Sequence, residues 1–223
     1  MADGPERRDP ITARHPYRAL VLDFAGVLTS PLGGSVRAWC RAQGLPEGAW
    51  RQALVEHPEG RALYLDLEAG RIGQREWNAG TAALLGVDPE DLMGRAHAAV
   101  RLAPAVAATA RAARAAGYTV AMLSNSYGLE GDPYDPYTAL GVWELLDLAV
   151  VSGREGLAKP DPALYRLLLD RLGLPAAACL FVDDQAANLP PAEALGMATL
   201  LADPDDRTTA ARLTALLGLP PRP

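Results

Sequence analysis

The fold of this chain is decided by residues 20–29, which read LVLDFAGVLT. The apolar run Ala19–Leu22 is too short for a helix and predicts a buried β-strand. Gly26 follows the carboxylate of Asp23 by three residues and allows a sharp turn at the end of that strand. Ligands of open α/β sheets bind just beyond the carboxyl ends of the strands. We therefore expect Asp23 at the edge of a cleft, although a turn or capping aspartate would give the same local pattern.

Composition and charge limit the kind of protein this is. The chain has 223 residues, 49% of them apolar, so it can bury a sizeable core. Its net charge of -6 and its lack of a basic run disfavour nucleic acid and anionic membranes as partners. No apolar stretch is long enough to span a bilayer, residues 1–17 lack a secretory signal, and two cysteines do not make a disulfide framework. We expect a cytoplasmic monomer or homodimer without membrane or nucleic-acid partners.

Strands and helices alternate over most of the chain. Apolar runs predict four further strands, at residues 118–123, 148–151, 178–182 and 197–201. Helical segments lie between them, which predicts an α/β fold of three layers, a parallel sheet covered by helices on both faces. Residues 31–102 differ, because they show helical periodicity and no good strand. They predict an all-helical module inserted after the first strand.

Polar residues occur at or near the carboxyl ends of four strands of this predicted sheet. They are Asp23, Ser124 with Asn125, the segment around Lys159, and Asp183 with Asp184. Because these ends share one edge of a parallel sheet, the side chains can converge on one site. Three carboxylates within a few Å cannot all stay ionised unaided, and a hard divalent cation such as Mg²⁺ resolves that conflict. Taken singly, the same residues also suit turns and helix caps.

The converging groups favour the binding of a phosphoryl group. The cation and Lys159, the only lysine among 21 basic residues, would offset charge on the phosphoryl oxygens. Ser124 and the backbone of Asn125 would donate hydrogen bonds to the same oxygens. Asp23 would attack in line and form an aspartyl-phosphate. Asp23, Ser124 and Lys159 are therefore the predicted catalytic residues, and Ser124, Asn125 and Lys159 the predicted substrate-binding residues.

The order and spacing of these motifs resemble those of the haloacid-dehalogenase-like (HAD) superfamily over about residues 17–202. The segments that carry the resemblance are DFAGV at 23–27, MLSN at 122–125, SGREGLAKPDP at 152–162 and FVDDQAAN at 181–188. The last of these, followed by ALGM at 194–197, is similar to the phosphatase domain of soluble epoxide hydrolases and their bacterial relatives.

The resemblance implies a division of the chain into core and cap. A Rossmann-like core would comprise residues 17–30 and 103–223, a helical cap residues 31–102, and a flexible tail residues 1–16. Substrate selection is expected in the cap and in the loop 127–137, whose acidic residues favour a polar or basic group on the substrate.

The resemblance also implies roles for single residues. Asp23 would be the nucleophile and a metal ligand, and the backbone carbonyl of Ala25 a second ligand. Asp184 would be the ligand from the acidic motif, with Asp183 ligating the metal or holding a metal-bound water. The chain is thus expected to be a Mg²⁺-dependent hydrolase of small phosphorylated metabolites.

Ala25 departs from the usual pattern of such phosphatases, which carry there a second aspartate that protonates the leaving group. General acid–base catalysis is worth about 10²–10⁴-fold, so three interpretations stay open. The first is a phosphatase whose substrate or cap supplies the proton, with His57 and His97 as cap candidates. The second is another hydrolase of the superfamily, such as a haloacid dehalogenase. A phosphonoacetaldehyde hydrolase is disfavoured, because it needs a cap lysine, which this sequence lacks. The third is a biosynthetic catalyst or a catalytically silent binding protein.

Overall fold

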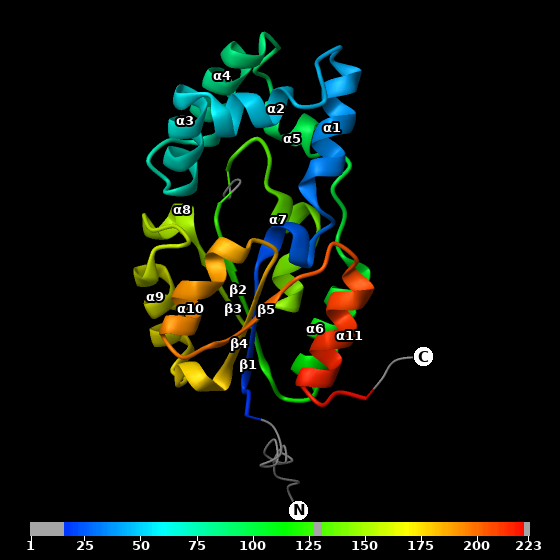
Figure 1. The fold of residues 1–223 in the computed structure, drawn as a ribbon, viewed down its shortest axis with the longest axis vertical. Coiled ribbons are helices and arrows are strands. Elements are labelled where there is room, and N and C mark those ends of the chain that lie inside the picture. The colour runs from blue at the N-terminus through cyan, green and yellow to red at the C-terminus, as the bar shows by residue number, and fades with distance from the viewer. Residues whose placement is uncertain (1–15, 127–130, 221–223) are drawn as a thin grey trace, which may run out of the picture.

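Five parallel strands form the centre of the structure, a computed structural model that describes residues 16–126 and 131–220 (Figure 1). The strands are β1 (Ala19–Leu22), β2 (Thr119–Ser124), β3 (Leu148–Val151), β4 (Cys179–Asp183) and β5 (Ala198–Leu201). Their order in the sheet is β3-β2-β1-β4-β5, so β1 lies in the middle. Leu22 is level with Met122 on one side and Val182 on the other, which brings Asp23 and Asp183 to the same edge.

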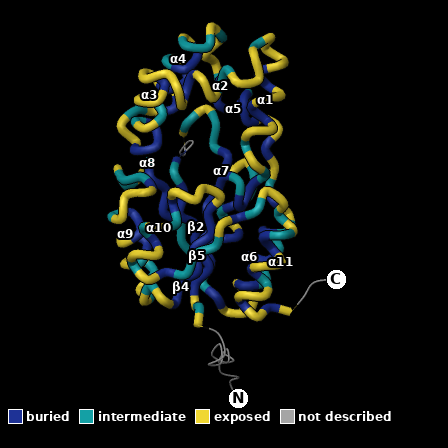
Figure 2. The backbone as a smooth tube through the Cα atoms, in the orientation of Figure 1, coloured by how far each residue is buried: buried dark blue, intermediate teal, exposed yellow. Residues whose placement is uncertain are grey.

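Helices cover both faces of this sheet, as the sequence predicts. Successive side chains of a strand point to opposite faces, so Leu20 and Leu22 pack in one cluster and Ala19 and Val21 in another. The first cluster lies against α6 (Pro104–Ala115) and α11 (Asp206–Leu216), the second against α9 (Pro162–Leu172) and α10 (Leu189–Ala194). Figure 2 shows the buried strands between helices with exposed outer sides. The fold class is therefore α/β with three layers.

The chain between β1 and β2 forms a separate group of helices, called the cap below. They are α1 (Leu32–Ala42), α2 (Ala49–Arg51), η2 (Gln52–Glu56), α3 (Pro58–Glu68), α4 (Gln74–Leu85) and α5 (Leu92–Ala96). Figure 1 shows them beyond the edge of the sheet at which β1 and β4 end. The cap has its own core, in which Trp39, Trp77 and Met93 are buried. Where the cap joins the core, the backbone N–H of Ala103 donates to the carbonyl of Leu28 at 2.8 Å.

Shorter elements complete the core near the strand ends. They are η1 (Phe24–Leu28), α7 (Pro136–Ala139), η3 (Val142–Leu145), α8 (Ser152–Glu155), η4 (Ala176–Ala178) and η5 (Ala186–Asn188). Within residues 16–126 and 131–220, no helix has the length and apolar character to cross a membrane. Part of the predicted substrate loop, residues 127–130, lies outside the described residues, as does most of the predicted tail.

Candidate active site

Three carboxylates from two strand ends meet at the edge of the sheet. Asp23 follows β1, Asp183 is the last residue of β4, and Asp184 comes next. One oxygen of each lies within 4.8 Å of the others. Asp183 is fully buried and Asp23 is 5% exposed, whereas Asp184 faces solvent. The convergence expected from the sequence is present, and Asp184 is the carboxylate that a bound molecule reaches most easily.

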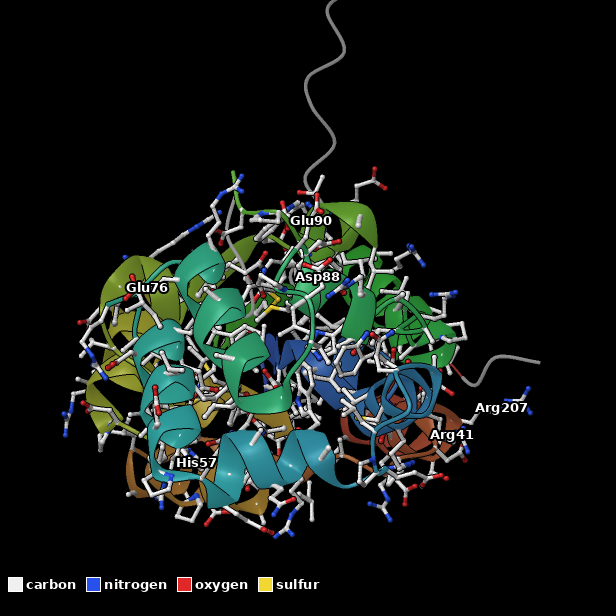
Figure 3. All side chains as sticks on the ribbon, turned by 90° about the horizontal axis from the view of Figure 1, so that it is seen from above. Arg41, His57, Glu76, Asp88, Glu90 and Arg207 are labelled. Carbon is white, nitrogen blue, oxygen red and sulfur yellow. The ribbon has the colours of Figure 1, made fainter. Side chains whose placement is uncertain are left out.

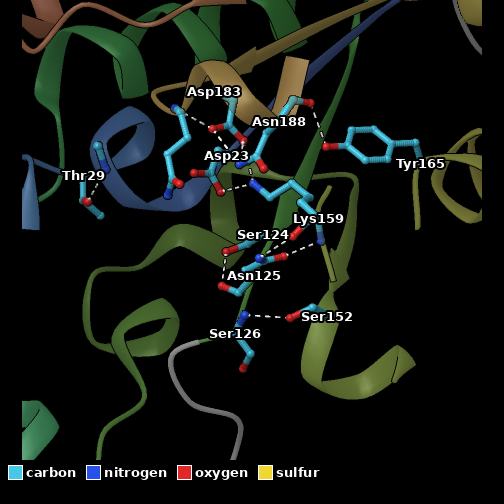
Figure 4. A network of polar contacts seen from close by, with 12 residues as sticks. Asp23, Thr29, Ser124, Asn125, Ser126, Ser152, Lys159, Tyr165, Asp183 and Asn188 are labelled. Atoms are coloured by element: carbon cyan, nitrogen blue, oxygen red, sulfur yellow. Dashed lines mark hydrogen bonds and ion pairs between the residues drawn. The ribbon is translucent and has the colours of Figure 1, made fainter. Parts of the chain in front are cut away.

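Lys159 bridges two of these carboxylates (Figure 4). Its ammonium lies 2.8 Å from Oδ1 of Asp23 and 2.7 Å from Oδ2 of Asp183, and the lysine side chain is only 2% exposed. The side chain of Asn125 holds the lysine backbone from both sides. Asn125 Oδ1 accepts from the N–H of Lys159 at 2.8 Å, and Asn125 Nδ2 donates to its carbonyl at 3.1 Å. Asn125 therefore fixes the position of the Lys159 backbone, from which the side chain extends to the carboxylates.

Asp183 has its hydrogen-bonding capacity filled by the protein. Besides Lys159, its oxygens accept from the backbone N–H of Gln185 at 2.8 Å and from Asn188 Nδ2 at 3.1 Å. Asn188 is held in turn, because its carbonyl accepts from the Tyr165 hydroxyl at 2.7 Å. Asp183 thus orients the site, while Asp23 and Asp184 keep more of their oxygen lone pairs available. The acidic motif includes Asn188, but the motif alone assigns it no contact.

Ser124 lies at the same edge of the sheet, but its hydroxyl contacts Asn125 and Tyr137 rather than the carboxylates. The hydroxyl donates to the carbonyl of Asn125 at 2.8 Å and lies 3.3 Å from the Tyr137 hydroxyl. Tyr137 itself packs on Phe24, with ring centroids 4.5 Å apart. Ser124 would have to exchange its bond to Asn125 for one to a ligand, and Tyr137 is a neighbour that the motif pattern did not reveal.

The electrostatics of the carboxylates fit a hard cation. Burial raises the pKa of Asp23 to about 7. Lys159 opposes this rise, and the neighbouring carboxylates add to it. Burial and Asp183 raise the pKa of Asp184 to about 6. Carboxylates whose ionised forms are disfavoured in this way gain most from a nearby positive charge. An all-oxygen donor set suits Mg²⁺ rather than a softer metal.

Gly26 allows the turn that follows β1, residues 23–27, to approach Asp184 closely. Its φ of +73° lies in the left-handed region, which favours glycine. A Cβ at this position would collide with Oδ2 of Asp184 and lie 2.8 Å from its Cγ. The turn also contains Ala25, which is buried directly after Asp23 and Phe24. The sharp turn expected from the sequence is therefore confirmed.

The cap reaches this site through the end of α3. Burial raises the pKa of the Glu68 carboxyl group, and the neighbouring side chains of Asn125 and Tyr64 oppose that rise. The backbone carbonyl of Glu68 accepts a hydrogen bond from the Ser152 hydroxyl. That hydroxyl also accepts from the N–H of Ser126 at 2.8 Å. Sequence reasoning missed Glu68, because its local sequence is that of an ordinary helical carboxylate.

The two cap histidines have different surroundings. His57 is exposed on the outside of the cap, where Figure 3 labels it. His97, in contrast, is only 5% exposed. Burial lowers the pKa of His97 to about 4, and its ring lies 5.9 Å from that of Trp50 and 6.0 Å from that of Tyr134. His97 is therefore a neutral imidazole at pH 7.

A cavity of about 590 Å³ is lined mostly by the cap and reaches the core at one residue. His97 lines it together with Trp50 and Trp77 of the cap. Gln185, the residue after Asp184, lines it from the core. The cavity thus places cap side chains close to the acidic motif.

The fold and site together define an α/β protein in which acidic residues and one lysine meet beyond the sheet. The model of the haloacid dehalogenase-like hydrolase family matches residues 17–196, and the chain belongs to this family. The resemblance stated from the motifs is therefore confirmed.

Two relatives illustrate what the chain is similar to. It is 29% identical over 205 residues to bifunctional epoxide hydrolase 2 of Mus musculus, a match that covers 82% of this chain and 36% of that protein. It is 37% identical over 76 residues to the sesquiterpene phosphatase astK of Aspergillus oryzae, covering 34% of this chain and 38% of that protein. The chain thus spans well under half of the length of either relative.

Solved structures share the fold. A predicted HAD-like family hydrolase from Porphyromonas gingivalis has a TM-score of 0.70 and 23% identity, over 90% of this chain and 98% of that chain. A HAD family enzyme from Bacteroides thetaiotaomicron, in complex with magnesium and inorganic phosphate, has a TM-score of 0.60 and 19% identity, over 82% of this chain and 93% of that chain. At these identities the similarity establishes the fold alone.

Proposed function

We propose that this protein is a Mg²⁺-dependent hydrolase of small-molecule phosphate monoesters that forms an aspartyl-phosphate on Asp23. The observation that carries the proposal is the cluster of three carboxylates within 4.8 Å, two of them bridged by one buried lysine. Membership of the hydrolase family and the similarity to a protein named as a phosphatase support it. So does the magnesium and phosphate complex of a protein with the same fold.

The residues that would hold the metal are Asp23, Asp184 and the backbone carbonyl of Ala25, with Asp183 orienting the set. A bound Mg²⁺ supplies positive charge that draws the phosphoryl group to the site and stabilises charge on its oxygens. Lys159 would contribute a second positive charge on the other side of Asp23. Because this ammonium also contacts the carboxylate of Asp183, it stays fixed while Asp23 reacts.

The reaction would proceed in two displacements at phosphorus. In the first, an oxygen of Asp23 forms a bond to phosphorus while the bond to the ester oxygen breaks, and the alcohol leaves. In the second, water attacks phosphorus, the bond to Asp23 breaks, and inorganic phosphate is released. Ser124 would donate its hydroxyl hydrogen bond to the phosphoryl group during both steps. Ala25 cannot protonate the leaving group, so the proton would come from the substrate or from solvent.

The test is metal-dependent turnover of p-nitrophenyl phosphate. We expect release of phosphate with Mg²⁺, none with EDTA, and none from D23N. The control D161N makes the same chemical change at an exposed carboxylate that caps α9 through the N–H of Ala163. Asparagine is an equally good N-cap, so D161N should keep wild-type turnover.

Two results would contradict the proposal. One is full turnover by D23N. The other is metal-independent release of chloride from 2-chloropropionate without turnover of any phosphate ester, which would make the protein a dehalogenase. Intact-mass measurement after acid quench gives independent support, because a phosphoryl group retained on the wild type and absent from D23N identifies the covalent step.

A further inference from the structure

The cap cavity has a wall that is mostly apolar. Its apolar lining comes from the side chains of Val36, Trp50, Leu54, Val55, Trp77 and Met93. Trp50 contacts two further tryptophans at ring-centroid distances of 5.5 and 5.8 Å, so the wall is a packed aromatic cluster rather than a flexible loop. The volume of the cavity, about 590 Å³, lies within the range of small-molecule sites, about 300–1,000 Å³.

The cavity borders segments that adjoin the carboxylate site. Leu32 and Gly33, at the start of α1, line it on the side of the turn that follows β1. Gln185 lines it from the side of the acidic motif. A phosphate ester whose phosphorus faces Asp23 would therefore direct its alcohol portion into the cavity.

Several polar residues of the lining are uncharged, namely Trp50, Tyr64, Trp77, His97 and Gln185. The indole N–H of Trp77 is buried and has no hydrogen-bond partner among the residues that the structure describes. A buried donor of this kind is satisfied by a ligand acceptor. His97 is held neutral by burial. The charged lining residues are Arg37, Glu47 and Arg51, all exposed, and Arg51 is paired with Glu56 at 2.6 Å.

We propose that the cap cavity binds an apolar alcohol portion, so that the preferred substrates are phosphate monoesters of aliphatic or aromatic alcohols rather than of sugars. This inference rests on the proposed phosphatase function and adds the substrate class. It differs from the expectation of a polar or basic group that loop 127–137 suggested. A sugar would leave hydroxyl groups facing the buried side chains of Leu54 and Met93 without partners, which is costly.

The experiment compares n-alkyl phosphates from methyl to octyl. If each added methylene is buried in the cavity, kcat/KM should rise about fourfold per methylene until the cavity is full. Two variants place a charge on exposed apolar residues of the cap. V55D changes a cavity residue that is 56% exposed, and L65D changes a residue that is 49% exposed and does not line the cavity. We expect V55D to flatten the dependence on chain length and L65D to retain the wild-type dependence.

Failure of the inference is distinguishable from failure of the phosphatase function. Turnover that is equal for methyl and octyl phosphate, or V55D and L65D with the same chain-length dependence, would overturn the apolar site while leaving the phosphatase intact. Absence of turnover with every ester would contradict the proposed phosphatase function. In that case the cavity is still tested by the binding of octyl phosphonate, measured as a change in tryptophan fluorescence. Tighter binding of octyl than of methyl phosphonate, weakened by V55D and unchanged in L65D, supports it, and equal binding of the two contradicts it.

Discussion

Replacement of Lys159 by methionine should destabilise the metal-free protein strongly. The lysine side chain is 2% exposed, and the side chains of its partners Asp23 and Asp183 are 7% and 0% exposed. K159M therefore leaves two buried carboxylates without their shared cation. Breaking a buried ion pair by removing one partner costs about 3–5 kcal/mol. For a chain of this size, 1 kcal/mol shifts Tm by about 2–4 °C. We therefore expect Tm to fall by about 6–20 °C.

The assay is thermal unfolding followed by circular dichroism at pH 7 in EDTA. Addition of Mg²⁺ to K159M should recover part of the loss, because a ligand that binds only the folded state stabilises it by about 2.7 kcal/mol at 100 times its Kd. Turnover of p-nitrophenyl phosphate should be lost even where stability is recovered.

The matched control is R171M. Arg171 pairs with Glu155 at 2.6 and 2.7 Å, but its side chain is 38% exposed, and exposed ion pairs contribute about 0–1 kcal/mol. R171M should therefore lower Tm by less than about 4 °C. If K159M and R171M unfold at the same temperature, the bridge between Asp23 and Asp183 is not what stabilises the carboxylate edge, and the reasoning fails.

Three further predictions concern the turn and the cap. G26A should weaken Mg²⁺ binding at least tenfold by calorimetry, because its Cβ collides with Asp184, whereas G34A, with open space around it, should not. A25D should raise turnover of alkyl phosphates by about 10²–10⁴-fold, because it restores a group that can protonate the leaving alcohol. The gain with p-nitrophenyl phosphate should be much smaller, since a good leaving group needs no proton. Equal gains with both substrates would contradict a role of the new carboxyl group in protonation. The pKa of His97 is about 4 when folded and about 6.5 when exposed, so the free energy of unfolding should fall by about 3 kcal/mol from pH 6.5 to 4, and urea titrations of H97L should lack that loss.

The sequence predicts the fold well where one periodicity dominates. The strand predicted at residues 148–151 has the bounds of β3, and the module predicted to be helical, residues 31–102, contains α4 at Gln74–Leu85. The helical periodicity of residues 31–102 includes residues 89–100, yet the helix there, α5, covers only Leu92–Ala96. Asp91 adopts a φ of +43°, which is incompatible with a helix and forces the later start. A backbone conformation of this kind is set by tertiary packing and leaves no periodic signal.

The site is predictable to the extent that parallel strands bring their ends together. Asp23, Lys159 and Asp183 meet as the sheet topology requires. The groups that orient them were not predictable, because their contacts join distant segments. Asn125 holds a lysine 34 residues away, and the backbone carbonyl of Glu68 accepts a hydrogen bond from Ser152, 84 positions further along the chain. Such pairings depend on how the cap sits on the core, which no local pattern specifies.

The cap and Lys159 meet around Asn125. The side chain of Asn125 holds both backbone polar groups of Lys159, and the Glu68 carboxylate at the end of α3 lies near enough to Asn125 to feel its amide. The backbone carbonyl of Glu68 accepts a hydrogen bond from Ser152, beside the same strand ends. Lifting the cap would break this hydrogen bond, and each polar group left buried and unpaired costs about 1–3 kcal/mol. The position of the cap and the placement of Lys159 are therefore coupled through the surroundings of Asn125.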